Sequence, residues 1–99
     1  QNAFVPFFGI LSATLTATPD IIKRSGAAML PFWFHRDENN RYQLSIDSPW
    51  QNWPSADAVA DTRIYMEKLE AEVRKHPEQY LWVHRRFKTR PQGSPDIYT

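Results

Sequence analysis

The sequence predicts an α/β fold, a fragment of a mostly parallel sheet flanked by helices, with one hairpin strand. Residues 4–8 and 27–34 are two short apolar runs, which is typical of strands covered on both faces in a parallel sheet. At residues 57–76 the apolar side chains recur at helical spacing instead. Because a further helix is expected between the two apolar runs, we predict a βαβ unit with a right-handed crossover.

A Ser/Thr-rich connection at residues 12–18 leads from the first apolar run into that helix. Pro19 suits the first turn of a helix, where its missing N–H is not needed, and Thr18 suits the capping position. We expect the helix to run to about Ser25 and to stop at Gly26, because glycine is favoured just past a helix end.

The second apolar run is expected to pair with the segment that follows it. Residues 37–40 have turn composition, and residues 41–47 alternate between apolar and polar side chains. This period of two predicts a strand with Tyr42, Leu44 and Ile46 on one face, antiparallel to the strand before it.

The remaining segments are predicted from residues that interrupt helices and strands. Residues 48–55 hold two prolines and two tryptophans, which indicates a loop whose indoles cover the sheet edge. The helix at 57–76 ends at Pro77. Residues 91–99 read as a turn-rich tail with no reason to pack, which leaves residues 1–90 as one folded unit.

Composition bounds the possible functions. A chain of 99 residues is at most one domain with a thin core. It has no cysteine, which excludes disulfides and thiolate chemistry, and its three scattered histidines suggest no metal site. The apolar runs are shorter than the roughly 18 residues that a membrane-spanning helix requires. Since the chain starts at Gln1 with a strand-like run at once, we expect a piece of a longer protein.

The charge is uneven along the chain. A net charge of +1 argues against nucleic-acid binding, yet residues 85–90 hold four cations and no acid. Arginine offers a fork to phosphate oxygens and lysine a point charge, so we expect this basic segment to bind anions. A solvated surface, or ion pairs with another part of the protein, is the plainer alternative.

Three blocks carry a resemblance to a known family. The run PEQYLWVHRRFKTRP at residues 77–91 closely resembles the ending of the late acyltransferases of lipid A biosynthesis, which add lauroyl or myristoyl chains to the lipopolysaccharide anchor. FVPFFG at residues 4–9 with Thr14, and residues 30–32 with Arg36, resemble earlier blocks of that family. Leu11, where a proline is common, and His35, where an arginine is frequent, depart from its pattern.

The resemblance implies a glycerolipid-acyltransferase-like fold, of which residues 1–90 would be the C-terminal part. The full-length enzyme would move a fatty acyl chain from acyl carrier protein to the phosphorylated, Kdo-modified lipid A precursor in lipopolysaccharide biosynthesis. It would work at the cytoplasmic face of the bacterial inner membrane, anchored by a segment outside this chain, with no cofactor and no nucleic acid.

The resemblance also suggests which residues meet substrate and membrane. Trp82 and Phe87 would lie at the membrane interface. The residues expected to bind substrate are Gly9, Thr14, Arg36, His84, Arg85, Arg86, Lys88 and Arg90.

Catalytic residues are not expected in this chain. The wider acyltransferase superfamily deprotonates the acceptor hydroxyl with a His-x4-Asp/Glu motif, but His35, His76 and His84 have no acid at that spacing. The catalytic pair is therefore expected upstream, and this chain alone is expected to be inert.

Two alternatives remain open. One is a non-enzymatic anion-binding module that grips nucleic acid or an acidic protein with residues 82–90, by stacking and phosphate contact. The other is an acyltransferase of mannosylated phosphoinositides, which would share the fold without the full HRRFKTRP match. The sequence upstream of Gln1 would discriminate the enzyme from the module. An isolated fragment with uncovered faces is expected to self-associate.

Overall fold

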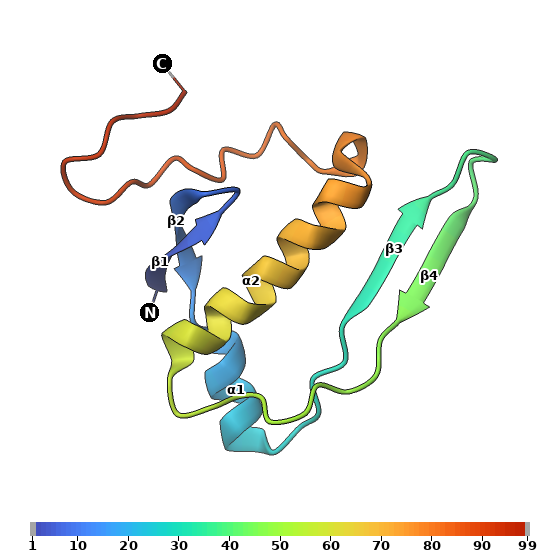
Figure 1. Ribbon diagram of the computed structural model, residues 1–99, viewed down its shortest axis with the longest axis horizontal. Coiled ribbons are helices and arrows are strands. Elements are labelled where there is room, and N and C mark those ends of the chain that lie inside the picture. The colour runs from blue at the N-terminus through green and yellow to red at the C-terminus, as the bar shows by residue number, and fades with distance from the viewer. Residues whose placement is uncertain (1, 99) are drawn as a thin grey trace.

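The computed structural model describes residues 2–98, so Gln1 and Thr99, the outer ends of the predicted unit and tail, lie outside the described residues. Two β-hairpins lie on opposite sides of a long central helix, and a shorter helix crosses one end (Figure 1). The elements in chain order are β1 (Asn2–Phe7), β2 (Ile10–Leu15), α1 (Ala17–Ser25), β3 (Phe32–Arg36), β4 (Tyr42–Ile46), α2 (Ala58–Lys75) and the 3₁₀ turn η1 (Pro77–Gln79).

The α/β class is correct, but the predicted βαβ unit is wrong. Residues 10–15 form β2, which pairs antiparallel with β1, where a connection was expected. The turn between them places Phe8 at φ 52° and Gly9 at φ 76°, the positive angles of a tight two-residue hairpin. Since β1–β2 and β3–β4 form separate two-stranded sheets, all strand pairs in residues 2–98 are antiparallel.

The first helix ends as predicted and begins slightly earlier. Gly26 adopts φ 72° and donates its N–H to the carbonyl of Ile22 at 2.9 Å, which closes the last turn. Thr16 rather than Thr18 occupies the capping position. Pro19 lies in the first turn, where the missing N–H has no partner to lose.

The hairpin β3–β4 confirms the predicted antiparallel pair, with Phe34 opposite Leu44. Its first strand begins at Phe32, and residues 27–31 are irregular. Pro31 lies before the strand and has no N–H to add to a ladder.

The helix α2 confirms the predicted helix within one residue at each end. Asp57 caps it by accepting hydrogen bonds from the N–H groups of Val59 and Ala60, both at 3.1 Å. The inner face of β1–β2 packs on this helix, and the buried apolar core consists of Val5, Phe7, Met66, Val73 and Phe87. None of the helices within residues 2–98 has the length and apolar character that crossing a membrane demands.

Residues 48–55 form the expected loop, but Trp53 packs on α2 and against Trp50 rather than over a sheet edge. Trp53 donates its indole N–H to the carbonyl of Asp61 at 3.2 Å, and its ring meets Trp50 edge-on at 5.3 Å. The buried carboxylate of Asp61 accepts the N–H and the hydroxyl of Ser55 at 2.8 and 2.7 Å. These bonds hold the loop over the start of the helix.

The turn of the second hairpin yields a testable prediction. The carboxylate of Asp37 accepts hydrogen bonds from Arg41 N–H, Gln43 Nε2 and Asn39 N–H, each at 2.9 Å. The bond from Arg41, and then that from Gln43, lower the pKa of Asp37 from its ordinary value of 3.8. A lowered pKa means that the carboxylate stabilises the fold above pH 3.8, and that this contribution is lost as the pH falls through the folded pKa.

We therefore expect Asp37→Ala to lower the free energy of unfolding and to loosen the tip of the hairpin. Glu38→Ala, which removes an exposed acid of the same turn, is the matched control and should change little. Amide hydrogen exchange of residues 32–46 measures the loosening of the hairpin, and an NMR titration of the wild-type Asp37 carboxyl measures its pKa. A titration at or above the ordinary value would contradict the assignment.

Candidate functional site

The basic segment at residues 84–90 is fastened to the first hairpin by Arg86. Its guanidinium donates to the carbonyl of Ala13 at 2.8 Å and to the hydroxyl of Thr14 at 2.7 Å, and it lies 5.7 Å from the ring centre of Phe7. Thr14 is buried. The structure thus brings together two residues that the sequence resemblance implied, and they bond to each other.

Arg90 and Tyr65 extend this contact along the same strand. Arg90 donates to the carbonyl of Leu11 at 2.5 Å, and the hydroxyl of Tyr65 donates to the carbonyl of Leu15 at 3.3 Å. Carbonyls of alternate residues point to the same edge of a strand, so those of residues 11, 13 and 15 share the edge of β2 that faces away from β1. Side chains distant in sequence therefore cap this edge where a third strand would otherwise pair.

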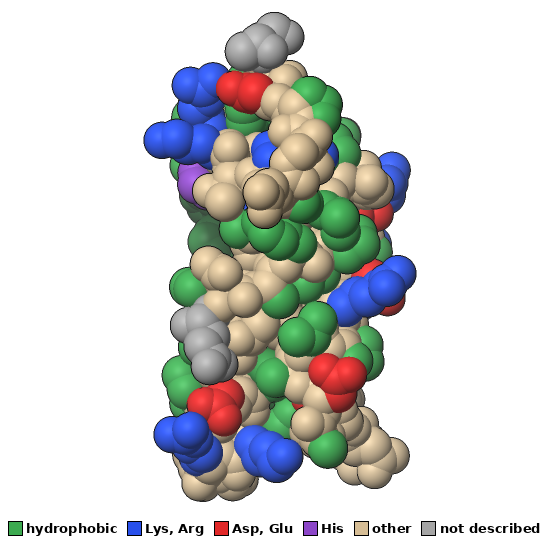
Figure 2. Space-filling model, turned by 90° about the vertical axis from the view of Figure 1, so that its left-hand side faces the viewer, with side chains coloured by type: hydrophobic (Ala, Val, Ile, Leu, Met, Phe, Trp, Pro, Cys, Tyr) green, Lys and Arg blue, Asp and Glu red, His purple; other side chains and the backbone are tan. Residues whose placement is uncertain are grey.

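The other cations of the segment remain at the surface. Arg85 is exposed and lies over the ring of Tyr98, 4.7 Å from its centre. Lys88 and His84 are exposed as well. On the face in Figure 2, Lys and Arg side chains gather beside a histidine at the upper end of the molecule. The four cations thus divide into a pair that holds the segment and a pair that faces solvent.

The two aromatic residues predicted to lie at the membrane interface have different environments. Trp82 is 51% exposed and donates its indole N–H to the carbonyl of Pro77 at 2.6 Å. Phe87 is only 9% exposed and belongs to the core, with its ring 6.0 Å from that of Phe7. A buried ring does not reach a lipid headgroup, so the membrane-interface prediction for Phe87 is wrong, and its role is packing.

The tail also departs from expectation. Its turn is present, because Ser94 donates its N–H to the carbonyl of Pro91 at 3.0 Å. However, the hydroxyl of Tyr98 accepts the N–H of Phe87 at 2.9 Å. The tail therefore packs on the basic segment, against the prediction that it would not pack.

Tyr80 lies at the start of this region, and its ring lies 5.9 Å from that of Phe7. Burial raises the pKa of the Tyr80 hydroxyl above 10.0, and the nearby charge of Arg86 opposes the shift in part. Since the net shift is upward, the hydroxyl stays protonated at neutral pH and provides no negative charge to the segment.

Gly9 lies in the exposed turn between β1 and β2. The turn is held on α2, because Phe8 donates its N–H to the carboxylate of Glu70. Arg74 completes the contact, with its guanidinium 3.1 Å from Glu70 and 4.6 Å from the centre of the Phe8 ring.

Arg36 is placed apart from the other predicted cations. It lies at the end of β3, across α2 from the first hairpin in Figure 1. The side-chain amide of Gln79 forms two hydrogen bonds with the backbone of Arg36. It accepts the N–H of Arg36 and donates to the carbonyl of Arg36, each at 2.7 Å. The backbone of Arg36 is thus held near η1, and its exposed side chain lies apart from the basic segment.

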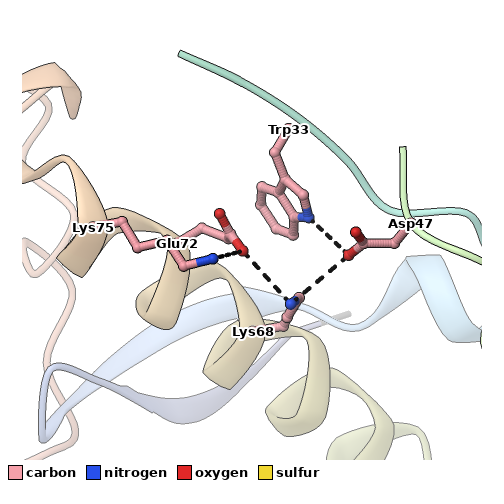
Figure 3. Close-up of polar contacts among 5 residues, drawn as sticks. All are labelled: Trp33, Asp47, Lys68, Glu72 and Lys75. Carbon is pink, nitrogen blue, oxygen red and sulfur yellow. Dashed lines mark hydrogen bonds and ion pairs between the residues drawn. The ribbon is translucent and has the colours of Figure 1, made fainter. Parts of the chain in front are cut away.

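A further polar network joins the second hairpin to α2 (Figure 3). Asp47 accepts the indole N–H of Trp33 at 3.2 Å and lies 3.7 Å from the amine of Lys68. Glu72 lies 3.5 Å from the same amine and 2.9 Å from that of Lys75. No pattern in the sequence signals a network whose partners lie on different elements. Because Lys68 and Lys75 each have a nearby acid, we assign the network a structural role.

The histidines show no catalytic arrangement among residues 2–98. The rings of His35 and His76 stack at 4.2 Å, which joins β3 to the end of α2, and the nearest carboxylate to His76 is that of Glu78 at 3.9 Å. The same residues contain no group of three metal-ligating side chains.

The two kinds of cation in the segment predict different effects on stability. Arg86→Ala removes two charge-assisted hydrogen bonds and leaves the hydroxyl of Thr14 without its donor. We expect a loss of about 1–2 kcal/mol in the free energy of unfolding, because the site is half-buried. Chemical denaturation measures this loss, and Arg85→Ala, the neighbouring exposed cation, should change stability by less than about 0.5 kcal/mol. Equal losses in the two variants would contradict the division of the cations into an anchoring pair and a solvent-facing pair.

Comparison with known proteins gives the context for this geometry. Residues 1–89 match the family model of the bacterial lipid A biosynthesis acyltransferases. The chain is 41% identical to the lipid A biosynthesis lauroyltransferase of Escherichia coli K12, over 99% of this chain and 33% of that protein. It is 40% identical to the palmitoleoyltransferase of the same organism, over 98% of this chain and 32% of that protein.

A third relative, the lipid A biosynthesis myristoyltransferase of the same organism, is 31% identical over 99% of this chain and 31% of its own length. The chain thus spans about a third of the length of these relatives. The resemblance noted in the sequence is confirmed: the chain belongs to the bacterial lipid A biosynthesis acyltransferase family.

Proposed function

We propose that this chain is the C-terminal part of an enzyme that transfers a fatty acyl group from acyl carrier protein to a hydroxyl of the Kdo-modified lipid A precursor. The match of residues 1–89 to the family carries this proposal. The relatives are named for lauroyl, palmitoleoyl and myristoyl transfer, which supports a fatty acyl donor. Since the chain covers about a third of their length, the activity belongs to the parent protein.

Within the proposed enzyme, Arg85, Lys88 and His84 form the part of the basic segment that meets an anion. They are exposed, whereas Arg86 and Arg90 bond to β2. The acceptor carries phosphates and the carrier protein is acidic, so exposed cations suit either partner. Arg86, Arg90 and Thr14 contribute by holding the segment in place, rather than by direct contact with phosphate.

Gly9 and Arg36 act at other points. Gly9 permits the tight turn that aligns β2 with the basic segment. Arg36 presents an exposed guanidinium near η1, where it would meet a second anionic group of the acceptor.

The proposed enzyme works at the cytoplasmic face of the bacterial inner membrane, held there by a segment outside this chain. The half-exposed indole of Trp82 suits the headgroup level of a bilayer, and each nearby cation adds about 1 kcal/mol of attraction to an anionic surface. The general base that deprotonates the acceptor hydroxyl belongs to the upstream His-x4-Asp/Glu motif. No cofactor is required for this transfer.

The parent sheet would be mostly parallel and would join the present strands at the free edge of β1. A nucleic-acid or acidic-protein binding module is disfavoured by the family match, and an upstream sequence with neither a catalytic motif nor a membrane anchor would revive it. The isolated chain would self-associate through the faces that the parent covers.

The proposed anion contact is tested in the full-length enzyme with Arg85→Ala and Lys88→Ala. Each loses one exposed charge that meets substrate, so we expect KM for the phosphorylated acceptor to rise about 5- to 10-fold, with the fold intact. Lys23→Ala, an exposed cation on α1, is the matched control and should leave KM unchanged.

Salt supplies a second measurement. The wild-type KM should rise with ionic strength as exposed charges are screened, and the Arg85→Ala/Lys88→Ala double variant should respond less. Wild-type turnover and an unchanged salt response in the double variant would remove the substrate role from this segment.

A further inference from the structure

The second hairpin carries an uncovered apolar face. The strand register sets Phe32 opposite Ile46, Phe34 opposite Leu44 and Arg36 opposite Tyr42. Residues directly opposite in an antiparallel pair share one face of the sheet. The exposed fractions of the apolar members are 62% for Phe32 and Phe34, 64% for Ile46, 63% for Leu44 and 70% for Tyr42.

The opposite face of this hairpin is already covered. Trp33 and His35 alternate with the exposed residues and so point to this face. Trp33 donates its indole N–H to Asp47, and the ring of His35 stacks on that of His76 at the end of α2. A two-stranded sheet that packs one face on a helix and leaves the other face apolar is typical of a layer in the interior of an α/β domain. The five exposed side chains are contiguous, unlike the scattered apolar residues of an ordinary surface.

A hollow on the covered side of the hairpin and the size of the chain show how open the molecule is. A cavity of about 320 Å³ opens between β3 and α2, and its apolar lining includes Met29, Leu30, Phe32 and Trp50. The radius of gyration is 15.3 Å, against about 13 Å for a compact domain of this length. The chain is thus more open than a domain that has buried its own apolar surface.

Lipid is a poor occupant for this face. Each strand of the two-stranded sheet has one unpaired edge, and open sheet edges are not tolerated within hydrocarbon. The tip of the hairpin holds Asp37 and Glu38 beside Arg36 and Arg41, so it carries no excess of cations to draw it to an anionic bilayer.

The length of the relatives indicates the occupant. The hairpin lies inside the region that matches the family, and the chain covers only 32% of a relative at 40% identity. A parent polypeptide of the relatives' length has about twice this length again from which to cover the face. A five-residue strand spans about 17 Å, which a helix of about 11 residues matches.

We propose that an amphipathic helix from the polypeptide preceding Gln1 packs on the outer face of β3–β4, through Phe32, Phe34, Leu44 and Ile46. The hairpin is then the middle layer between that helix and α2. This inference rests on the premise of the proposed function that the chain is the C-terminal part of a longer parent, and it does not depend on which reaction the parent catalyses.

Photo-crosslinking in the full-length protein tests the contact. A benzoylphenylalanine in place of Phe34 keeps an aromatic side chain at the site, and we expect it to crosslink within one polypeptide to a peptide that precedes Gln1. The same probe at Asn39, in the exposed turn of the hairpin, is the control and should give at most a tenth of that product. Peptide mass spectrometry after illumination in native membranes identifies the products.

A lipid adduct at position 34, or a crosslinked dimer as the main product, would overturn the proposal. The readout needs no acyltransferase activity, so an inactive parent with the expected crosslink would refute the proposed function alone. As a second measurement, Leu44→Asp should lower the midpoint of thermal unfolding of the full-length protein, while Asn39→Asp should not. Equal midpoints of thermal unfolding for the Leu44→Asp variant and the wild type would count against the covering helix.

Discussion

The two hydrogen bonds from Arg86 to β2 are the contact on which the rest of the candidate site depends. They join residues more than 70 positions apart in the chain, through the carbonyl of Ala13 and the hydroxyl of Thr14. Residues 84–90 form no helix or strand of their own, so side-chain contacts of this kind, together with the bond from Arg90 to Leu11, hold the segment on the hairpin. With them, Phe87 reaches the core and Arg85 and Lys88 face solvent at fixed positions.

The same contact explains why the first hairpin remains two-stranded at β2. Arg86, Arg90 and Tyr65 satisfy the carbonyls that a neighbouring strand would use. An edge filled with charged and polar side chains resists pairing with further strands. A further strand of this sheet could therefore pair only with the free edge of β1. Arg86 and Arg90, which the sequence resemblance assigned to substrate binding, therefore act as part of the fold.

The sequence was sufficient for elements whose pattern is strong and local. The helical spacing of residues 57–76, the glycine at position 26 and the alternation of residues 41–47 each predicted an observed element. It failed at β2, because its Ser and Thr residues are typical of connections and only the positive φ of Phe8 and Gly9 folds them back. It also failed at Phe87, since an aromatic among cations resembles an interface residue until the ring of Phe7 is brought beside it. The family resemblance identified the basic segment but could not separate its anchoring cations from its exposed ones, because that separation depends on contacts with β2.

A double-mutant cycle between Arg86 and Thr14 in the full-length protein tests the central contact most directly. Thr14→Val removes the hydroxyl that accepts the guanidinium while keeping the shape of the side chain, and Arg86→Ala removes the donor. If the bond holds the segment as described, chemical denaturation should give a coupling free energy of about 1 kcal/mol between the two sites. Additive losses, with a coupling near zero, would show that Arg86 does not anchor the segment and would contradict the account.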